Sequence, residues 1–314
     1  MPANDNKPYG QQRFLVISLD PIHVGTGGYR LGRVDLSIVR EPGTNLPKIP
    51  GTSLNGAIRQ YAAYRRGGRD ALKCAGQKDH CGLPTCPICY TFGSLQTRGE
   101  NGETVPHSGV VNLSDARLML FPVHSMDGPV WVTCPATLAA VDITAAVSDS
   151  QKAVMASGLQ KCKNLNLGWL MLGKDDQTFT WPQGNPAALL DAKVKDRTVV
   201  VADGLFGQIV NSNLEVRTSV SIKPETGAAE PGALFTYEAI PRAAILWFDV
   251  IQDDFRGKFA QCEGRDKLDK AQKPVDVVRA GLKLAQMLGI GGMGTRGFGR
   301  LQLLSDWDVT PEGV

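Results

Sequence analysis

Residues 289–300 read GIGGMGTRGFGR, and this stretch indicates the fold because its composition suits no packed helix or strand. Six of its twelve residues are glycine and two are arginine. Glycines let a backbone adopt positive φ angles and approach another molecule closely, so that main-chain N–H groups and an arginine fork can hold a phosphate or a sugar. A loose turn between a helix and a strand is the alternative, but such a turn needs fewer glycines.

The position of this glycine-rich loop separates it from the common phosphate-binding motifs. Dinucleotide fingerprints and P-loops follow a strand and open a helix. Here a helical pattern opens at Pro274 and precedes the loop, and a strand pattern at 298–304 follows it. One face of that helix is predicted to be buried, and it holds Val275, Val278, Leu282, Ala285 and Leu288.

The rest of the core follows the same alternation of strands and helices. An apolar run at 13–19 predicts a central strand, a helical pattern extends to Arg66, and 110–120 and 244–251 predict two further strands. Thr52 or Ser53 is the predicted N-cap of the helix. Its predicted buried face holds Leu54, Ala57, Ile58, Tyr61 and Ala62.

The order strand, helix, strand therefore occurs twice. This order predicts an α+β fold with a ferredoxin-like (RRM-type) core, whose four-stranded sheet is a common RNA-binding platform. Insertions rather than tandem domains account for the length, so residues 1–314 are predicted to form a single RRM-like domain. The insertions are a cysteine-rich segment at 68–108, an α/β lid at 121–202 and a hairpin at 211–241.

The composition excludes several classes of protein. Hydrophobic residues make up 42% and charged residues 21% of the 314 residues, as in ordinary globular proteins, and no apolar run is long enough to span a membrane. The N-terminal residues lack a signal-peptide pattern, so a cytoplasmic protein without a membrane partner is expected. A net charge of +3 excludes a bulk polycation and restricts any nucleic-acid surface to a local patch.

Four of the seven cysteines lie between Cys74 and Cys89. Cys86 and Cys89 have the C-x2-C spacing at which two thiolates share one tetrahedral zinc ion, and Cys74 with either Cys81 or His80 completes four ligands. Free structural cysteines are the alternative, but clustered thiols in a reducing compartment favour a metal. No HExxH-like general base is nearby. The expected Zn²⁺ is therefore structural, and the cysteine-rich segment becomes a zinc-binding insertion.

Residues 211–241 predict a long β-hairpin. Two apolar, β-prone arms flank a turn-rich centre that reads PETGAAEPG. The arms carry Arg217 and Lys223, which are cations suited to contact with a nucleic acid. A plain surface hairpin is the alternative interpretation.

Three N-terminal motifs resemble the signature of RAMP-type backbone subunits in type III CRISPR effector complexes, where RAMP denotes repeat-associated RNA-binding proteins. The motifs are HVGTG at 23–27, VDLSIVRE at 34–41 and PGTSLNGAIR at 50–59. The cysteine-rich insertion with its CPIC motif, the hairpin and the glycine-rich loop also resemble elements of these subunits. The resemblance covers most of the chain and is weakest from 130 to 201.

The resemblance implies how such a chain binds RNA. The glycine-rich loop is expected to grip the backbone of a guide RNA, and the hairpin, as a thumb, to displace a base of the guide–target duplex at regular intervals. The expected partners are guide RNA, single-stranded target RNA, and neighbouring copies or sister subunits of an effector complex. The residues expected to contact RNA are Ser53, Asn55, Arg59, Arg217, Lys223, Gly292, Gly294, Thr295, Arg296 and Gly297.

The resemblance also implies target-RNA cleavage. RNA carries its own nucleophile, the 2′-hydroxyl, so the protein needs to supply little chemistry. A single carboxylate can catalyse cleavage by holding Mg²⁺ or Mn²⁺ at the phosphate or by accepting the hydroxyl proton. That role falls to Asp35, in the loop after the first strand, with His23, Tyr237 and Glu238 as assisting residues. The chain is then expected to be a metal-dependent endoribonuclease.

Each of these residues also has a purely structural interpretation. The structural alternatives are a turn cap or an ion pair with Arg33 or Arg40 for Asp35, a strand cap for His23, packing for Tyr237, an ion pair with Arg242 for Glu238, and a solvated helix face for Arg59. At the level of function, the alternatives are a non-catalytic scaffold subunit of the same complex and a free-standing, zinc-stabilised RNA-binding protein.

Overall fold

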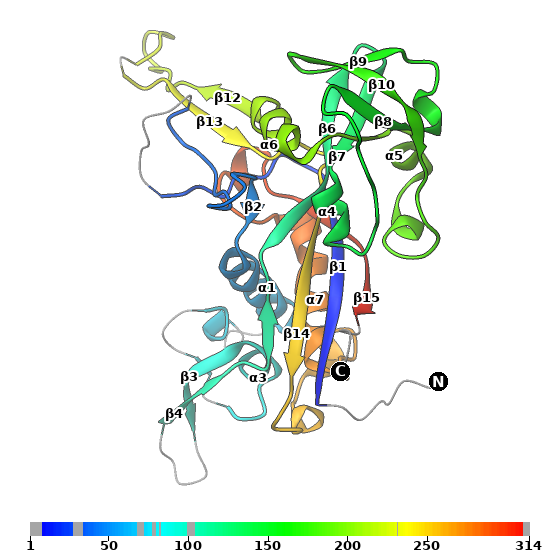
Figure 1. The fold of residues 1–314 in the computed structure, drawn as a ribbon. Helices are drawn as coiled ribbons and strands as arrows, with labels where there is room; N and C mark the ends of the chain where they lie inside the picture. Colours follow the sequence, from blue (N-terminus) through cyan, green and yellow to red (C-terminus); the bar gives the residue numbers. More distant parts are fainter. Residues whose placement is uncertain are drawn as a thin grey trace.

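The described chain forms a mixed α+β fold around one large mixed sheet (Figure 1). The computed structural model describes residues 8–27, 34–67, 72–76, 80–81, 83–98, 104–230 and 232–309. The main path of the sheet is β15 (Leu301–Val309), β1 (Tyr9–Ser18), β14 (Ile245–Asp253), β6 (Ala116–Ser125), β7 (Gly128–Thr133), β11 (Thr198–Val200), β8 (Lys152–Ala156), β10 (Leu170–Phe179) and β9 (Asn164–Leu167). Two short strands lie off this path: β2 (Lys48–Ile49) pairs with β6, and β5 (Val111–Leu113) pairs with β14.

Two helices, α1 (Gly51–Arg66) and α7 (Pro274–Leu288), pack against each other beside the antiparallel part of the sheet, formed by β15, β1, β14 and β6. Gly281 of α7 lies so close to the Ile58 carbonyl oxygen of α1 that a side chain would overlap with it. This close packing buries the predicted apolar faces, including Leu54 and Leu282. Leu288 is an exception to the prediction: it ends α7 and is 49% exposed.

Two boundaries differ from the expectation. Helix α1 begins at Gly51, directly after Pro50, so the prediction of Thr52 or Ser53 as its N-cap is wrong. The Asp115 carboxylate accepts a hydrogen bond from the Gly51 N–H at 2.8 Å instead and satisfies one free amide of the first turn. Asp115 also lies where the strand predicted at 110–120 is interrupted, which divides that segment into β5 and β6.

The region from 121 to 202 adds strands to the edge of the large sheet. Strand β6 runs from the core into this region, and β7, β11, β8, β10 and β9 follow it with both parallel and antiparallel neighbours. Three helices lie in or directly after it: α4 (Pro135–Ala139), α5 (Ala192–Asp196) and α6 (Asp203–Ser212). A hydrophobic cluster that includes Leu15, Phe179 and Trp247 joins the region to the core.

Short 3₁₀ helices complete the connections between these elements. They are η1 (Ser157–Leu159), η2 (Ala187–Leu189), η3 (Phe259–Gln261), η4 (Arg265–Lys267) and η5 (Gly294–Arg296).

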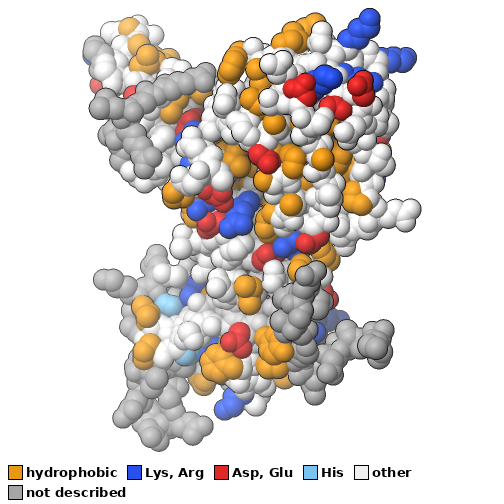
Figure 2. All heavy atoms as spheres, viewed as in Figure 1, with side chains coloured by type: hydrophobic (Ala, Val, Ile, Leu, Met, Phe, Trp, Pro, Cys, Tyr) orange, Lys and Arg blue, Asp and Glu red, His pale blue; other side chains and the backbone are white. Residues whose placement is uncertain are grey.

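The hairpin predicted at 211–241 is present as a separate two-stranded sheet with arms β12 (Glu215–Ser219) and β13 (Phe235–Ala239). Its first two predicted residues belong instead to the end of α6. The hairpin projects from the body of the molecule in Figure 1, and residues 220–230 are all exposed. Val220, Ile222 and Leu234 are exposed apolar residues on it, and hydrophobic atoms are visible on this projection in Figure 2.

The cysteine-rich insertion contains α3 (Pro87–Phe92) and the antiparallel pair β3 (Gly93–Arg98) and β4 (Thr104–Ser108). Helix α3 contacts both α1 and α7, so the insertion is attached to the helical layer of the core.

The surface is mixed in charge. Acidic and basic side chains lie side by side across the middle of the face in Figure 2, in agreement with the net charge of +3. Among the described residues, no helix has both the length and the apolar character needed to cross a membrane.

Candidate functional site

The segment from 34 to 38 lies along the hairpin arm β13 and brings the predicted cleavage residues together. The Leu36 N–H donates to the Thr236 carbonyl oxygen at 3.0 Å, and the Glu238 N–H donates to the Leu36 carbonyl oxygen at 3.2 Å. The Ile38 N–H donates to a carboxylate oxygen of Glu238 at 2.9 Å. This pairing sets Asp35 directly beside Thr236.

Asp35 is exposed, and hydrogen bonds hold its carboxylate on one side only. Its Oδ2 accepts from the backbone N–H of Thr236 at 2.7 Å and from the Thr236 Oγ1 at 2.8 Å. These two donors, the backbone one above all, hold the pKa of Asp35 below its ordinary value because they stabilise the ionised form. No described residue hydrogen-bonds to Oδ1, so this oxygen is free to bind a cation or accept a proton.

Glu238, in contrast, is buried and has both carboxylate oxygens occupied. Arg40 donates from Nη1 to Oε1 at 2.6 Å and from Nη2 to Oε2 at 2.8 Å. The predicted alternative pairing of Glu238 with Arg242 is therefore wrong, and this bidentate pair directs Arg40 toward Glu238 rather than Asp35. Arg33, the other suggested partner of Asp35, lies outside the described residues. Glu238 fixes the segment around Ile38 onto β13.

His23 is buried and oriented through its ring. Its Nδ1 lies 2.7 Å from the Glu238 carbonyl oxygen, which can only accept, so a neutral His23 carries its proton on Nδ1 and leaves Nε2 as an acceptor. The His23 carbonyl oxygen accepts the Gly292 N–H at 2.8 Å. His23 does not cap strand β1, which ends at Ser18; it joins the glycine-rich loop to β13 instead.

Tyr237 is buried at the base of the hairpin. Its ring centroid lies 5.5 Å from that of Phe298 and 6.2 Å from that of His23. The Ser219 Oγ lies 3.2 Å from its hydroxyl. The packing interpretation of Tyr237 therefore fits the structure better than direct contact with a substrate.

The glycine-rich loop connects α7 to β15, in the predicted order of helix, loop and strand. Strand β15 begins at Leu301, later than the predicted Phe298, because Gly297 and Gly299 adopt positive φ angles. Gly291 also has a φ of 94°, and a side chain there would lie 2.5 Å from the His23 carbonyl oxygen. Glycine at 291 is therefore required for the loop to pack on the segment that contains His23. Residues 291–292 and 294–297 remain exposed.

Two cation–π contacts cross between the glycine-rich loop and the hairpin. The Arg217 guanidinium of β12 lies 4.6 Å from the ring centroid of Phe298 in the loop. The exposed Arg296 of the loop lies 5.5 Å from the ring centroid of Phe235 in β13. Such contacts stabilise by about 0.5–1 kcal/mol at exposed sites. The loop, the hairpin base and Asp35 consequently form one continuous site.

The other residues predicted to contact RNA occupy different environments. Ser53 and Asn55 lie in the first turns of α1 and are partly exposed, while Lys223 and Thr295 are exposed on the hairpin and the loop.

Arg59 is buried, which contradicts the alternative of a solvated helix face and disagrees with the predicted contact of Arg59 with RNA. Its Nε donates to the Cys74 carbonyl oxygen at 2.7 Å, and its Nη1 donates to that of Phe92 at 3.3 Å. Its Nη2 lies 2.8 Å from the His80 Nδ1. The guanidinium therefore connects α1 to the cysteine-rich insertion and does not present its donors to solvent.

The four cysteines of the insertion form a cluster whose geometry fits a tetrahedral metal ion. The Sγ atoms of Cys74, Cys81, Cys86 and Cys89 all lie within 4.8 Å of one another. The Cys74–Cys86 and Cys81–Cys89 separations are 3.7 and 3.8 Å. Zinc–sulfur bonds of about 2.3 Å in a tetrahedron require sulfur atoms about 3.8 Å apart. Of the two alternatives for the fourth ligand, Cys81 is in the cluster, and the His80 ring is directed to Arg59.

The four thiols hydrogen-bond to one another, so their pKa values diverge. Hydrogen bonds from the neighbouring thiols, Cys74 first, hold the pKa of Cys81 below its ordinary value, whereas such bonds, again from Cys74 first, raise the pKa values of Cys86 and Cys89. Arg66 Nη1 donates to the Cys86 Sγ at 2.9 Å and supplies a positive charge beside it. The four thiols can therefore hold a metal such as zinc.

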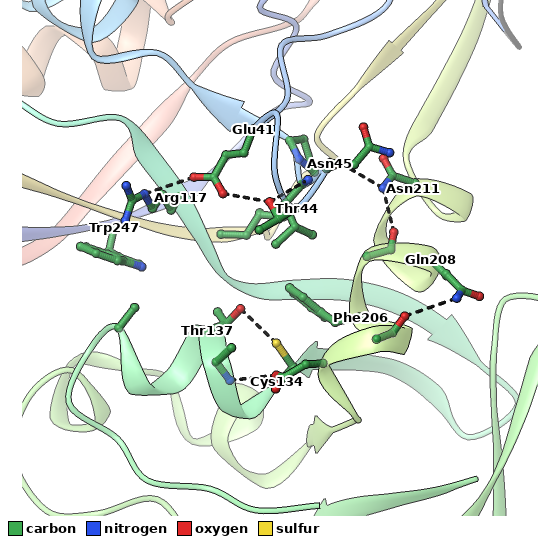
Figure 3. A pocket seen from close by; sticks show the side chains of 18 residues that line it. Glu41, Thr44, Asn45, Arg117, Cys134, Thr137, Phe206, Gln208, Asn211 and Trp247 are labelled. Atoms are coloured by element: carbon green, nitrogen blue, oxygen red, sulfur yellow. Dashed lines mark hydrogen bonds and ion pairs between the residues drawn. The ribbon is translucent and has the colours of Figure 1, made fainter. Parts of the chain in front are cut away.

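A separate cavity of about 820 Å³ lies between the loop at 41–47, α4, α6 and Trp247 (Figure 3). Its lining includes apolar residues such as Leu118 and Phe206 and the ion pair of Glu41 with Arg117, 3.2 Å apart. None of the residues predicted to cut or contact RNA lines this cavity, so it is not part of the candidate site.

Sequence reasoning missed three residues of the site: Thr236, Arg40 in its pairing with Glu238, and Arg66. Thr236 is a polar, β-branched residue in a hairpin arm, a place where threonine is common. Its contact with Asp35 spans 201 positions of the chain, so no local pattern could have revealed it.

Comparisons with known proteins place these features in a family. The sequence model of the RAMP superfamily matches residues 17–302. The CRISPR system Cmr endoribonuclease Cmr4 of Pyrococcus furiosus is 26% identical over 252 residues, which are 73% of this chain and 77% of that protein.

Several solved structures of similar fold are of Cmr proteins. A chain in the cryo-EM structure of type III-B Cmr-beta in the apo state has a TM-score of 0.62 at 16% identity, covering 96% of this chain and 98% of that one. The form of Cmr-beta bound to cognate target RNA gives 0.61 at 16% identity, with 94% and 97% covered. Oligomeric Cmr4 from Pyrococcus furiosus gives 0.57 at 19% identity, with 96% and 99% covered. At these identities the likeness establishes a shared fold.

Proposed function

The chain belongs to the RAMP superfamily, and we propose that it is a guide-RNA-binding backbone subunit of a type III CRISPR effector complex that cleaves complementary target RNA. The observation that carries the proposal is the position of Asp35. Its exposed carboxylate is held by Thr236 in the arm of a projecting hairpin, and the residues on either side of Thr236, Phe235 and Tyr237, contact the glycine-rich loop. The Cmr4 relative carries the name of an endoribonuclease, and one structure of similar fold belongs to a complex with target RNA.

In this proposal the guide RNA runs over the exposed part of the glycine-rich loop. Gly294 and Thr295 present backbone N–H groups at the surface, and Arg296 offers a guanidinium. Such groups bind phosphate and sugar oxygens whatever the base sequence, as a subunit that accepts many different guides requires. The N–H groups of Gly292 and Gly297 bond within the protein, and these exposed glycines instead let the RNA backbone approach closely. Ser53, Asn55, Arg217 and Lys223 extend this surface. We leave Arg59 out of it, because its donors are used inside the protein.

The hairpin is assigned as the thumb that separates bases of the guide–target duplex. It projects from the body, its tip is exposed, and it carries apolar side chains that can replace a stacked base, including Ile222 and Leu234. Displacement of a base bends the target backbone, which is what in-line attack of a 2′-hydroxyl on the adjacent phosphate needs. Asp35 lies at the base of this hairpin.

Asp35 is the catalytic carboxylate of the proposal. Its Oδ1, to which no described residue hydrogen-bonds, can bind a divalent cation at the scissile phosphate or accept the 2′-hydroxyl proton. Mg²⁺ or Mn²⁺, when bound, would offset the negative charge that develops on the phosphate. His23, Tyr237 and Glu238 are buried and are assigned to hold the loop, the hairpin base and the Asp35 segment in place.

The fold that we assign to the chain is a ferredoxin-like core with insertions. The sheet order β15, β1, β14, β6 with α1 and α7 packed beside it agrees with two strand–helix–strand units of such a core. We assign residues 1–314 to one domain, with a zinc-binding insertion at 68–108, a lid at 121–202 and a thumb at 211–241. A structural Zn²⁺ on the four cysteines would join the first insertion to the core. Because thiolate ligands need a reducing compartment, the cytoplasm remains the proposed location.

A non-catalytic scaffold subunit is the alternative function. To separate the two, the protein is assembled with its partner subunits and guide RNA and given an end-labelled complementary RNA with Mg²⁺. Cleavage at regular intervals, with products that end in a 2′,3′-cyclic phosphate and begin with a 5′-hydroxyl, is the expected result. Tight binding of the target without cleavage would establish the scaffold, and failure to retain guide RNA would exclude both functions.

A further inference from the structure

We propose that Thr236 is a positioning residue for RNA cleavage: from the base of the hairpin, it holds the Asp35 carboxylate in its reactive orientation. The inference rests on the proposed function and adds a residue to it. Thr236 donates to one carboxylate oxygen from two groups, its backbone N–H at 2.7 Å and its Oγ1 at 2.8 Å. The Asp35 N–H donates in return to the Thr236 Oγ1 at 3.1 Å.

These three hydrogen bonds close a ring and define the direction of the carboxylate. A threonine hydroxyl has one proton and two acceptor lone pairs, so Oγ1 can donate to Oδ2 and accept from the Asp35 N–H at the same time. Both bonds to the carboxylate end on Oδ2, so neither of them occupies Oδ1. An exposed aspartate without such bonds would rotate among several rotamers. A carboxylate that is already fixed does not lose this rotational freedom at the moment of reaction, which lowers the entropic cost of the step.

The residues on both sides of Thr236 connect it to the RNA-binding elements. Phe235 stacks with Arg296 of the glycine-rich loop, with 5.5 Å between the guanidinium and the ring centroid. Tyr237 packs against Phe298 of the same loop. Thr236 thus lies in a strand whose neighbouring residues contact the loop and whose arm continues into the projecting hairpin. A guide on the loop and a base displaced by the hairpin would both act on the strand that orients Asp35.

The hydroxyl group can be tested separately from the fold. Thr236→Val keeps the β-branched shape and the backbone N–H but removes Oγ1, whereas Thr236→Ser keeps the hydroxyl and removes a methyl group. Thr218 is a matched control, because it lies directly opposite Thr236 in the hairpin and has no hydrogen bond to Asp35. Thr218→Val therefore makes the same chemical change at the neighbouring position.

The measurement is the single-turnover cleavage rate of the assembled, guide-loaded complex, together with its affinity for target RNA. Thr236→Val is expected to lower the rate by about 10- to 100-fold, the usual effect of removing a group that orients a reactive one, with affinity unchanged. Thr236→Ser is expected to recover most of that loss, and Thr218→Val to cleave at the wild-type rate.

The outcomes separate this inference from the proposed function. Equal losses in Thr236→Val and Thr236→Ser would show that packing matters and not the hydroxyl, and would overturn the inference. A wild-type rate in Thr236→Val while Asp35→Ala is inactive would also overturn it and leave the proposed function intact. A wild-type rate in Asp35→Ala would overturn both.

Discussion

Arg59 and Arg296 carry the same guanidinium, but burial gives them different functions. Arg296 is exposed on the glycine-rich loop and its charge is available to a phosphate. Arg59 is buried, and its donors end on the Cys74 and Phe92 carbonyl oxygens. Asp35 and Glu238 show the same contrast: Arg40 occupies both carboxylate oxygens of the buried Glu238, whereas no described residue hydrogen-bonds to Oδ1 of the exposed Asp35.

Because Arg59 connects α1 to the cysteine-rich insertion, its substitution is expected to affect the metal cluster. Arg59→Met would leave two carbonyl oxygens without their donor, which costs about 1–3 kcal/mol each when buried. The wild-type protein is expected to contain about one zinc per chain. The variant is expected to melt at lower temperature and to release its zinc faster to a chelator, as measured by thermal unfolding and by a colorimetric zinc assay.

The matched control for this variant is Arg296→Met, which removes an exposed guanidinium. It is expected to retain zinc and thermal stability while weakening guide binding. An Arg59→Met protein with normal zinc content and stability but weakened guide binding would contradict the structural role and return Arg59 to the RNA surface.

The residue types alone could not have separated these functions. The motif that contains Arg59 indicated a contact with RNA, and the helical pattern placed Arg59 outside the apolar stripe. The pattern fails here because the cysteine-rich insertion covers that side of α1, and the insertion is 15 residues away from Arg59 at Cys74. Which helix face is solvated depends on tertiary packing that local periodicity does not contain.

At the scale of elements, the glycine-rich loop depends on some of its glycines more than on others. Gly291 has a φ of 94° and abuts the His23 carbonyl oxygen, whereas a side chain at Gly294 would have open space around it. Gly291→Ala is therefore expected to displace the loop at a cost of about 1–3 kcal/mol, which corresponds to a loss of about 5- to 150-fold in guide affinity.

Gly294→Ala is the matched control and is expected to bind guide RNA within a few-fold of the wild-type affinity. Filter binding with guides of unrelated sequence, across a salt titration, measures both variants. The loss in Gly291→Ala should be the same for every guide, because the loop contacts the backbone and not the bases. Equal affinities for the two variants would contradict the assigned geometry of the loop.

The pair of helices α1 and α7 contains a pH-dependent contact. Asp269 accepts hydrogen bonds from Arg65 of α1, at 2.5 Å from Nη2, and from Lys283 of α7 at 2.8 Å. Arg65 first, and then Lys283, lower the pKa of Asp269 to about 2. A carboxylate with a lowered pKa stabilises the folded state above its unfolded pKa of about 3.9, and this contribution is lost as the pH falls toward 2.

Asp269→Asn is accordingly expected to reduce the free energy of unfolding at pH 7 by about 1 kcal/mol, a modest value because the contact is partly exposed. The difference from the wild-type protein should shrink between pH 4 and pH 2. Urea unfolding across this pH range measures it. A difference that stays constant with pH would show that Asp269 stabilises the helix pair by other means than its charge.

The elements that were predicted well have strong local signals. Helix α7 begins at the predicted Pro274, and the hairpin arms flank the predicted turn-rich centre. The division of the segment at 110–120 and the N-terminus of α1 were not predicted, since both depend on Asp115 and its contact with Gly51, 64 positions away. Local patterns reveal elements, while long-range polar contacts decide where they begin and end.

The whole molecule is organised so that insertions extend the core in different directions. The region from 121 to 202 continues the sheet, the cysteine-rich insertion attaches to the helical layer, and the hairpin projects freely (Figure 1). The sequence of 130–201 contained short apolar runs without a clear period, so the strand order of this part could not be derived from it. Parallel neighbours such as β7 and β11 are distant in the chain, and their pairing leaves no local trace.

The candidate site lies where these parts meet. The glycine-rich loop comes from the C-terminal half of the core, Asp35 from the loop after β1, and Thr236 from the base of the hairpin. The predicted loop and the predicted carboxylate are both part of it, although the sequence contained no evidence that they are neighbours beyond the family resemblance. Their juxtaposition supports a mechanism in which guide binding and target cleavage use adjoining surfaces.

The measurement that tests this account most directly is target cleavage by a guide-loaded complex that carries Asp35→Asn. This substitution keeps the size of the side chain and removes its charge, and Asp176→Asn, at an exposed carboxylate in β10, is the matched control. Assembly and target binding are expected to be unchanged, while cleavage at this subunit's positions is lowered by about 100-fold or more and the control cleaves normally. Cleavage by Asp35→Asn at the wild-type rate would contradict the proposed role of Asp35.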